Sequence, residues 1–111
     1  MLNELWNDAA GGFHPLSAPD FLPEPRLREV QLRRLKAVVA RAWAHVELFR
    51  SRMDERGLTP DSIRQLSDIA ALPFTVKTDL RDTYPFGLFA SSMGDVVRLH
   101  ASSGTTGKPI V

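Results

Sequence analysis

The chain has 111 residues, 43% of them hydrophobic and 24% charged, which is typical of one globular domain or of part of one. Its formal net charge of +1 gives no overall electrostatic attraction to nucleic acid or to a membrane surface. The sequence contains no cysteine, which excludes disulfides, a thiolate nucleophile and cysteine metal sites. The sequence also contains neither a long apolar run nor the features of a signal peptide, so we expect a cytoplasmic protein with no nucleic-acid or membrane partner.

The first 25 residues form a segment of distinct composition. They carry four acidic residues and no lysine or arginine, and residues 13–25 hold four of the eight prolines. Proline removes backbone donors and disfavours helix in the residue before it, so we predict an extended, acidic, proline-rich arm over residues 1–25. Residues 26–56 reverse the balance, with nine basic residues against four acidic ones, which we interpret as one solvated helix face.

A helical region is predicted over residues 26–90. From Arg26 the apolar side chains recur at steps of three and four residues, which is typical of an amphipathic helix with Trp43 in its buried stripe. This helix is expected to pause near His45–Glu47, to resume to Arg56, and to end at Gly57, a natural C-terminal stop.

Shorter elements are expected after that helix. Thr59 and Pro60 suit the start of another helix, and Ser67 or Asp68 can begin a short turn that ends before Pro73. A further helix is predicted from Val76 to about Thr83, with Thr75 as its cap. Two groups of side chains are given structural rather than chemical roles: the charged Asp79, Arg81 and Asp82, and the aromatic Tyr84, Phe86 and Phe89.

The last part of the chain, residues 91–111, changes character. The stretch DVVRLHAS, residues 95–102, has the alternating and β-branched pattern of a strand, and PIV, residues 109–111, reads as the start of another. We therefore predict an α/β fold in which a mainly helical N-terminal region leads into a strand, a glycine-rich loop and a strand.

That loop, SSGTTGK, carries the chemistry most evident in the sequence. Glycines at 104 and 107 permit backbone conformations that other residues avoid, and successive amide groups in such a turn can converge on an anion. Four hydroxyls and Lys108 add donors and a positive charge, which favours polyphosphate binding over a plain connector. A P-loop is disfavoured because Ser102 stands where its first glycine is required, and Pro109 stands where its serine or threonine is required.

The strand–SSGTTGKP–strand sequence resembles the phosphate-binding loop of the adenylate-forming superfamily. Lys108 precedes Pro109, whereas the wider superfamily usually has its lysine after the proline, and this order resembles the phenylacetate–coenzyme A ligases. LPFTVKTDLRDTYPFGLFA, residues 72–90, followed by VVRLHASSGTTGKPIV, is very similar to that branch. The resemblance covers roughly residues 30–111 and is most specific from Leu72 onward. Glu47 stands where the branch commonly has a proline, which argues against a sharp helix break there.

The resemblance implies an ATP-dependent ligase that forms an acyl-adenylate from a small-molecule carboxylate and then a coenzyme A thioester, with magnesium as cofactor. It implies that the loop binds the ATP phosphates. His100 directly precedes the loop, and we expect it to be a strand residue that positions the loop through a hydrogen bond rather than an acid or base. The residues carried over to phosphate binding are Ser102, Ser103, Gly104, Thr105, Thr106, Gly107 and Lys108. No catalytic residue and no metal ligand is assigned within the chain.

The same resemblance implies that the chain is the N-terminal part of a longer ligase. The family's adenine, ribose and acyl contacts and its catalytic lysine lie beyond this loop, so the rest of the ligase is an expected partner and the isolated chain is expected to be inactive. By analogy with the family, a homodimer is also expected. Two alternatives stay open from the sequence: a stand-alone helical interaction module, motivated by the amphipathic helix and the acidic arm, and a subunit of a split adenylating enzyme.

Overall fold

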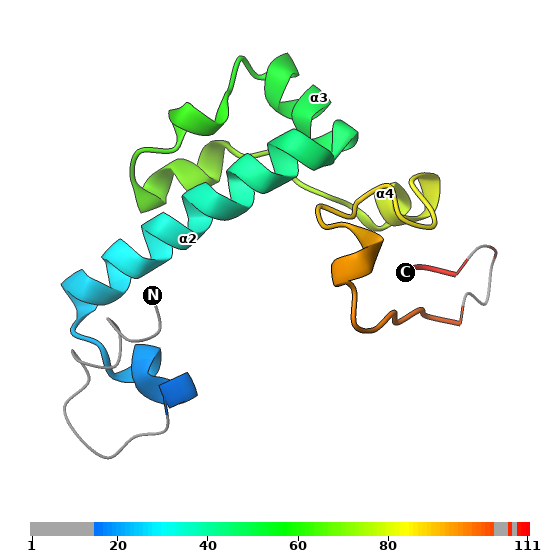
Figure 1. Cartoon of the computed structure of the whole chain (residues 1–111). Helices are drawn as coiled ribbons and strands as arrows, with labels where there is room; N and C mark the ends of the chain where they lie inside the picture. The colour runs from blue at the N-terminus through cyan, green and yellow to red at the C-terminus, as the bar shows by residue number, and fades with distance from the viewer. Residues whose placement is uncertain (1–14, 104–106, 108) are drawn as a thin grey trace.

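A long helix, α2 (Glu24–His45), is the element around which the helical region is arranged (Figure 1). The computed structural model describes residues 15–103, 107 and 109–111. Pro25 lies in the first turn of α2, where the backbone N–H that proline lacks has no partner within the helix. The helix thus begins two residues before the predicted start at Arg26, and its length agrees with the predicted amphipathic pattern.

The expected interruption of this helix is confirmed at Val46. This residue has extended backbone angles, φ −112° and ψ 102°, between the end of α2 and the start of α3 (Glu47–Glu55). Val46 is buried, so the break directs an apolar side chain inward while the chain changes direction. The break lies at the residue before Glu47 and needs no proline, so the expectation that Glu47 disfavours a sharp break there was wrong.

The main core lies where α2 and α3 pack against the segment that follows them. Val39, Met53 and Ile63 are its fully buried members. Half-buried apolar side chains surround them, namely Leu32, Leu35, Trp43, Phe49, Leu58 and Leu72. The predicted burial of the stripe is confirmed for Val39 and in part for Trp43, whereas Val38, which the same pattern placed in the stripe, is 58% exposed. A smaller cluster joins Leu22 and Val30, with Leu27 against them, near the start of α2.

The end of α3 and the turns after it follow local sequence signals. Gly57 has a φ of +65°, in the left-handed region that favours glycine, and it stops the helix as predicted. Two 3₁₀ helices, η2 (Pro60–Ser62) and η3 (Leu66–Ala71), then lie alongside α2 (Figure 1). The helix predicted after Thr59 is thus limited to one turn, because Ile63 leaves the helical conformation to enter the core.

The predicted helix near residues 76–83 is confirmed as α4 (Lys77–Asp82), but its cap is different. The Asp79 carboxylate accepts a hydrogen bond from the Val76 N–H, with an N–O distance of 2.8 Å. The expected cap was Thr75. Aspartate in the first turn serves the same purpose, because it satisfies a free backbone donor and carries negative charge at the positive end of the helix.

The N-terminal arm differs from its prediction where the structure describes it. Residues Pro15–Phe21 form a 3₁₀ helix, η1, rather than an extended segment. Residues 1–14 lie outside the described part. Pro19 lies inside this 3₁₀ helix. The predicted division of the chain at residues 25 and 90 stays a prediction.

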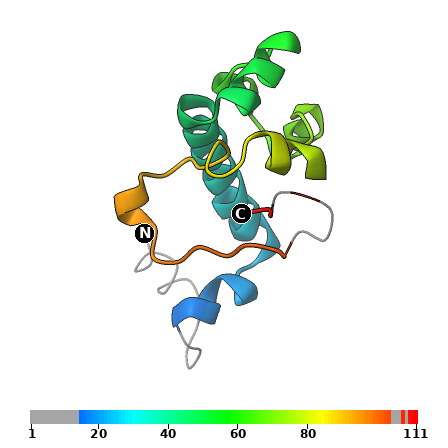
Figure 2. The ribbon, with the colours of Figure 1, turned by 90° about the vertical axis from the view of Figure 1, so that its right-hand side faces the viewer.

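The predicted strands are not confirmed. In residues 15–103, 107 and 109–111 the structure contains no strand, and after η4 (Met93–Asp95) residues 96–101 run without regular secondary structure (Figure 2). Only an isolated antiparallel bridge joins Ser102 to Ile110. A strand is stable only when a neighbouring strand pairs with it and its apolar side chains are covered. Val97 is 100% exposed, so no described element packs against this segment. The mainly helical character is confirmed, and the α/β class stays a prediction.

Candidate functional site

The antiparallel bridge between Ser102 and Ile110 closes the glycine-rich loop at its base. The Ser102 N–H donates to the Ile110 carbonyl oxygen at 2.9 Å. The Ile110 N–H donates in turn to the Ser102 hydroxyl oxygen at 3.4 Å. Because Ser102 uses its hydroxyl oxygen as acceptor in this contact, the hydroxyl proton is left to donate to another acceptor.

Of the seven loop residues predicted to bind phosphate, the structure describes Ser102, Ser103 and Gly107. The other four, Gly104, Thr105, Thr106 and Lys108, lie outside the described residues. Ser103 is exposed beside the closing bridge. The structure therefore brings the two ends of the predicted loop together, while the assignment of all seven residues to phosphate binding stays a prediction.

Gly107 has the backbone that the loop prediction required of a glycine. Its φ is +136°, a conformation that residues with a side chain rarely adopt. A Cβ atom at this position would meet no atom within 4 Å, so the demand for glycine comes from the backbone and not from crowding. The open space leaves this backbone accessible to a ligand.

His100 lies two residues before the bridge and is exposed. Among the described residues no hydrogen bond joins its side chain to the loop, so its predicted positioning role stays a prediction. The nearby strand-like residues Val97 and Leu99 are also exposed. Residues 96–101, which lead into the loop, are therefore not held in place by packing against another described element.

The strongest electrostatic feature lies in the helical region, where α3 meets α4. Arg52 and Asp79 form a two-pronged ion pair, in which both Nη–Oδ distances are 2.7 Å. Arg52 Nη1 also donates to the Phe74 carbonyl oxygen at 2.9 Å. The sequence indicated a structural role for Asp79, which is confirmed, but it did not indicate Arg52 as the partner, 27 residues earlier.

The pair changes the acidity of both groups. The hydrogen bonds from Arg52, together with the Val76 N–H, lower the pKa of Asp79 to about 2. The hydrogen bond to Asp79 raises the pKa of Arg52 above its ordinary value. Asp79 is buried and accepts three hydrogen bonds, so it is held as a structural carboxylate and is not available as an acid or base near neutral pH.

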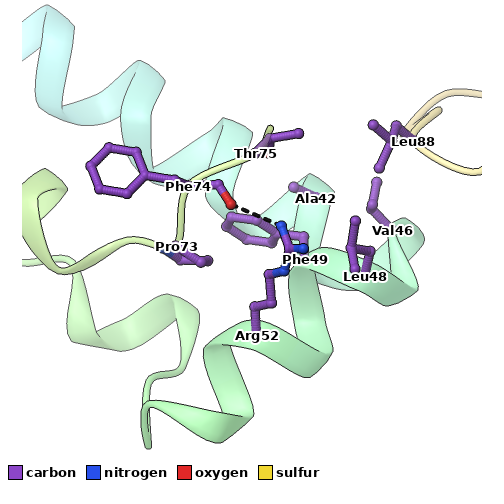
Figure 3. A pocket seen from close by; sticks show the side chains of 9 residues that line it. All are labelled: Ala42, Val46, Leu48, Phe49, Arg52, Pro73, Phe74, Thr75 and Leu88. Carbon is purple, nitrogen blue, oxygen red and sulfur yellow. Dashed lines mark hydrogen bonds between the residues drawn. The ribbon is translucent and has the colours of Figure 1, made fainter. Parts of the chain in front are cut away.

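A pocket of about 170 Å³ lies beside this ion pair (Figure 3). It is lined by the end of α2, the first turns of α3, the loop before α4 and one residue after it, and it is partly open to solvent. Its lining is mostly apolar and consists of Ala42, Val46, Leu48, Phe49, Arg52, Pro73, Phe74, Thr75 and Leu88. None of these residues belongs to the glycine-rich loop.

Neither a metal-binding cluster nor a membrane-spanning helix is present among the described residues. Among these residues, no three or more histidine, aspartate or glutamate side chains gather in a way that could hold a metal ion. None of the helices there is both long enough and apolar enough to cross a membrane.

Comparison with known proteins gave matches to curated sequences, whereas no family profile matched. The chain is 53% identical over 90 residues to phenylacetate-coenzyme A ligase of Thermus thermophilus, a match that covers 81% of this chain and 20% of that protein. It is 54% identical over 85 residues to the phenylacetate-coenzyme A ligase of Pseudomonas putida, covering 77% of this chain and 19% of that protein. The enzyme of the same name from Escherichia coli K12 is 51% identical over 85 residues, with 77% and 20% covered.

Among solved structures, the chain is similar to 2-hydroxyisobutyryl-CoA ligase, which was crystallised with 2-HIB-AMP and CoA in its thioesterification state. That match has a TM-score of 0.70 and 32% sequence identity, and it covers 79% of this chain and 20% of that one. The resemblance read from residues 72–111 is therefore confirmed. By sequence, this chain belongs to the phenylacetate-coenzyme A ligase family, as a segment that spans about 20% of the length of the curated relatives.

Proposed function

We propose that this chain supplies the ATP-phosphate-binding loop of an ATP-dependent ligase that joins an aryl carboxylic acid to coenzyme A. The observation that carries the proposal is the identity of 51–54% to four phenylacetate-coenzyme A ligases. The structural neighbour with a bound acyl-adenylate and CoA supports the same reaction class. No comparison favours the helical interaction module.

In the proposed reaction, a carboxylate oxygen of the substrate attacks the α-phosphorus of ATP. The bond between that phosphorus and the bridging oxygen to the β-phosphate breaks, which gives an acyl-adenylate and pyrophosphate. The thiolate of coenzyme A then attacks the acyl carbonyl carbon, and the carbon–oxygen bond to AMP breaks. The difficult part of the first step is the negative charge that develops on the departing pyrophosphate.

The loop is suited to hold that charge. Its residues offer hydroxyl donors, backbone amides and Lys108, and the bridge from Ser102 to Ile110 fixes where the loop begins and ends. The free proton of the Ser102 hydroxyl and the open backbone at Gly107 are the described groups that we assign to the phosphates. Donors held in place before the reaction stabilise developing charge without reorganisation.

Magnesium is expected in this reaction because it shares the charge of the phosphates. The described residues contain no cluster of histidine, aspartate or glutamate that fits a metal ion. We assign none of these described residues to magnesium. The predicted α/β class belongs to this proposal as well: the segments predicted as strands, residues 95–102 and 109–111, would form them when further strands pair with them.

The proposal can be tested with a chimera in which this chain replaces the matching segment of the Thermus thermophilus ligase. We expect phenylacetate to drive exchange of labelled pyrophosphate into ATP. Gly107→Ala should weaken ATP binding, because forcing a side chain into this backbone costs about 1–3 kcal/mol, or roughly 5- to 150-fold. Gly94→Ala is the matched control, since its φ is ordinary and the nearest atom to a new Cβ is 3.7 Å away.

A folded chimera that supports no exchange, while the parent ligase does, would contradict the proposed function. Equal ATP affinities for the Gly107→Ala and Gly94→Ala chimeras would contradict the role of the loop alone.

A further inference from the structure

The side of α2 that faces away from the main core carries a seam of side chains that begins apolar and becomes basic. Residues three and four positions apart lie on the same side of a helix. One such series consists of Leu27, Val30, Arg34, Ala37, Arg41 and Ala44. Figure 1 shows α3, η2 and η3, which pack against α2, gathered on one side of it. The last four residues of the series are exposed, and we call them the basic seam.

The basic seam lies in a one-sided run of charge. Residues 30–46 contain no aspartate or glutamate and four basic residues, namely Arg33, Arg34, Lys36 and Arg41. In the described part of the chain, none of these four forms a salt bridge. Asp95 borders the same open pocket as Arg41, but its carboxylate accepts a hydrogen bond of 2.7 Å from the Ser92 hydroxyl. Like charges on neighbouring turns repel one another, so a negatively charged segment placed among them would be stabilised.

The apolar start of the series is covered by the residues that precede α2. Leu22 is buried against Val30, and Leu27 packs against them. The chain therefore reaches α2 across the same side of the helix that carries the basic seam. Whatever precedes η1 is attached next to that seam.

The sequence before η1 has a composition that suits the basic seam. Residues 1–14, which lie outside the described part of the chain, contain Glu4 and Asp8 and no lysine or arginine. They also contain Leu5 and Trp6, and the two small alanines of the seam leave room for such side chains against the helix. Fourteen residues extend to about 45 Å, whereas the basic seam is about 15 Å long.

We propose that residues 1–14 bind along the basic seam, with Glu4 and Asp8 beside Arg34 and Arg41. A single exposed ion pair contributes little to stability, whereas several opposite charges acting together contribute more. The segment is part of the same chain, so its effective concentration at the seam is high. The binding is mainly electrostatic and therefore weakens with salt. It does not depend on the proposed ligase reaction.

The experiment uses the absence of cysteine from the chain. Asn7→Cys in the isotope-labelled 111-residue chain gives one attachment site for a nitroxide spin label, which broadens the NMR signals of nearby amides. At low salt the amide signals of Arg34, Ala37 and Arg41 should lose about half of their intensity or more, and about 1 M salt, which screens charges beyond about 3 Å, should restore most of it. A segment that is merely tethered would broaden only the start of α2, whatever the salt. The signal of Asp82, on α4, should keep its intensity.

Charge-reversal variants identify the partners. Arg34→Glu combined with Arg41→Glu should abolish the broadening at low salt, and the further changes Glu4→Lys and Asp8→Lys should restore it. Arg64→Glu is the matched control, because Arg64 is exposed and lies between η2 and η3, away from the seam. If the double reversal disrupts the fold, Arg34→Gln with Arg41→Gln should weaken the broadening in the same direction.

Three results would overturn the proposal. One is the absence of broadening at Ala37 and Arg41 at low salt, and another is broadening that persists in a folded variant without the two arginines. The third comes from mixing spin-labelled chains that carry no isotope with isotope-labelled chains that carry no spin label. Broadening of the seam signals in that mixture would assign the occupant to a second copy of the chain.

Discussion

Truncation of Met53 to alanine tests the core that joins α2, α3 and the segment after them. Met53 is 0% exposed and packs with Val39 and Ile63. Burying a methionine side chain is worth about 1.5–3 kcal/mol, and the cavity left by its removal adds to that loss. We therefore expect Met53→Ala to lower the free energy of unfolding of the chain by about 2–5 kcal/mol.

The assay is urea unfolding of the 111-residue chain, followed by far-ultraviolet circular dichroism. The chain offers a matched control in Met93→Ala, the same chemical change at a side chain that is 50% exposed and belongs to neither core cluster. That variant should stay within about 0.5 kcal/mol of the parent. Met53→Leu, which keeps the volume, should cost less than about 1.5 kcal/mol.

The reasoning would be refuted if Met53→Ala and Met93→Ala shifted the unfolding midpoint equally. It would also fail if Met53→Leu cost as much as Met53→Ala, because the loss would then not come from a cavity. A changed slope of the transition in any variant would mean that the compared states differ, so the slope is checked first.

Three further predictions follow from the same structure. Asp79 has a pKa of about 2 in the folded chain against an ordinary 3.8, so its stabilising contribution is complete above pH 3.8 and is lost as the pH falls toward 2. Acid unfolding of Asp79→Asn should lack this part of the pH dependence. Equal pH profiles of stability for the variant and the parent would count against the ion pair. Gly57→Ala should destabilise the chain by roughly 1–2 kcal/mol in urea unfolding, because a side chain is forced into the left-handed region. The control Gly94→Ala should have a smaller effect. A larger loss of stability for Gly94→Ala than for Gly57→Ala would contradict the assigned end of α3. The isolated chain should show no ATP–pyrophosphate exchange with phenylacetate, and measurable exchange would disprove its dependence on the rest of a ligase.

Local signals in the sequence predicted several helix boundaries well. The pause near His45–Glu47, the stop at Gly57 and the helix near residues 76–83 are all present in the structure. Each depends on residues close together in the chain, whose backbone preferences act whatever surrounds them. The loop and the residues before it were likewise enough to identify the family, since that identification rests on residue order alone.

Other features depended on what the segments meet in space. The helix predicted after Thr59 ends after one turn because Ile63 is drawn into a core formed mainly by α2 and α3. The residues before the loop have a strand pattern but form no strand, because pairing needs a neighbouring strand that the described chain does not provide.

The order of residues was enough to predict the glycine-rich loop, the amphipathic helices and the family to which the chain is related. Folding in three dimensions was needed to reveal that Arg52 reaches Asp79 across 27 residues, that Asp79 rather than Thr75 caps α4, and that four segments line a pocket of about 170 Å³. The physical reason is that a turn or a helix end needs only neighbours in the chain. An ion pair or a pocket needs side chains that folding alone brings together.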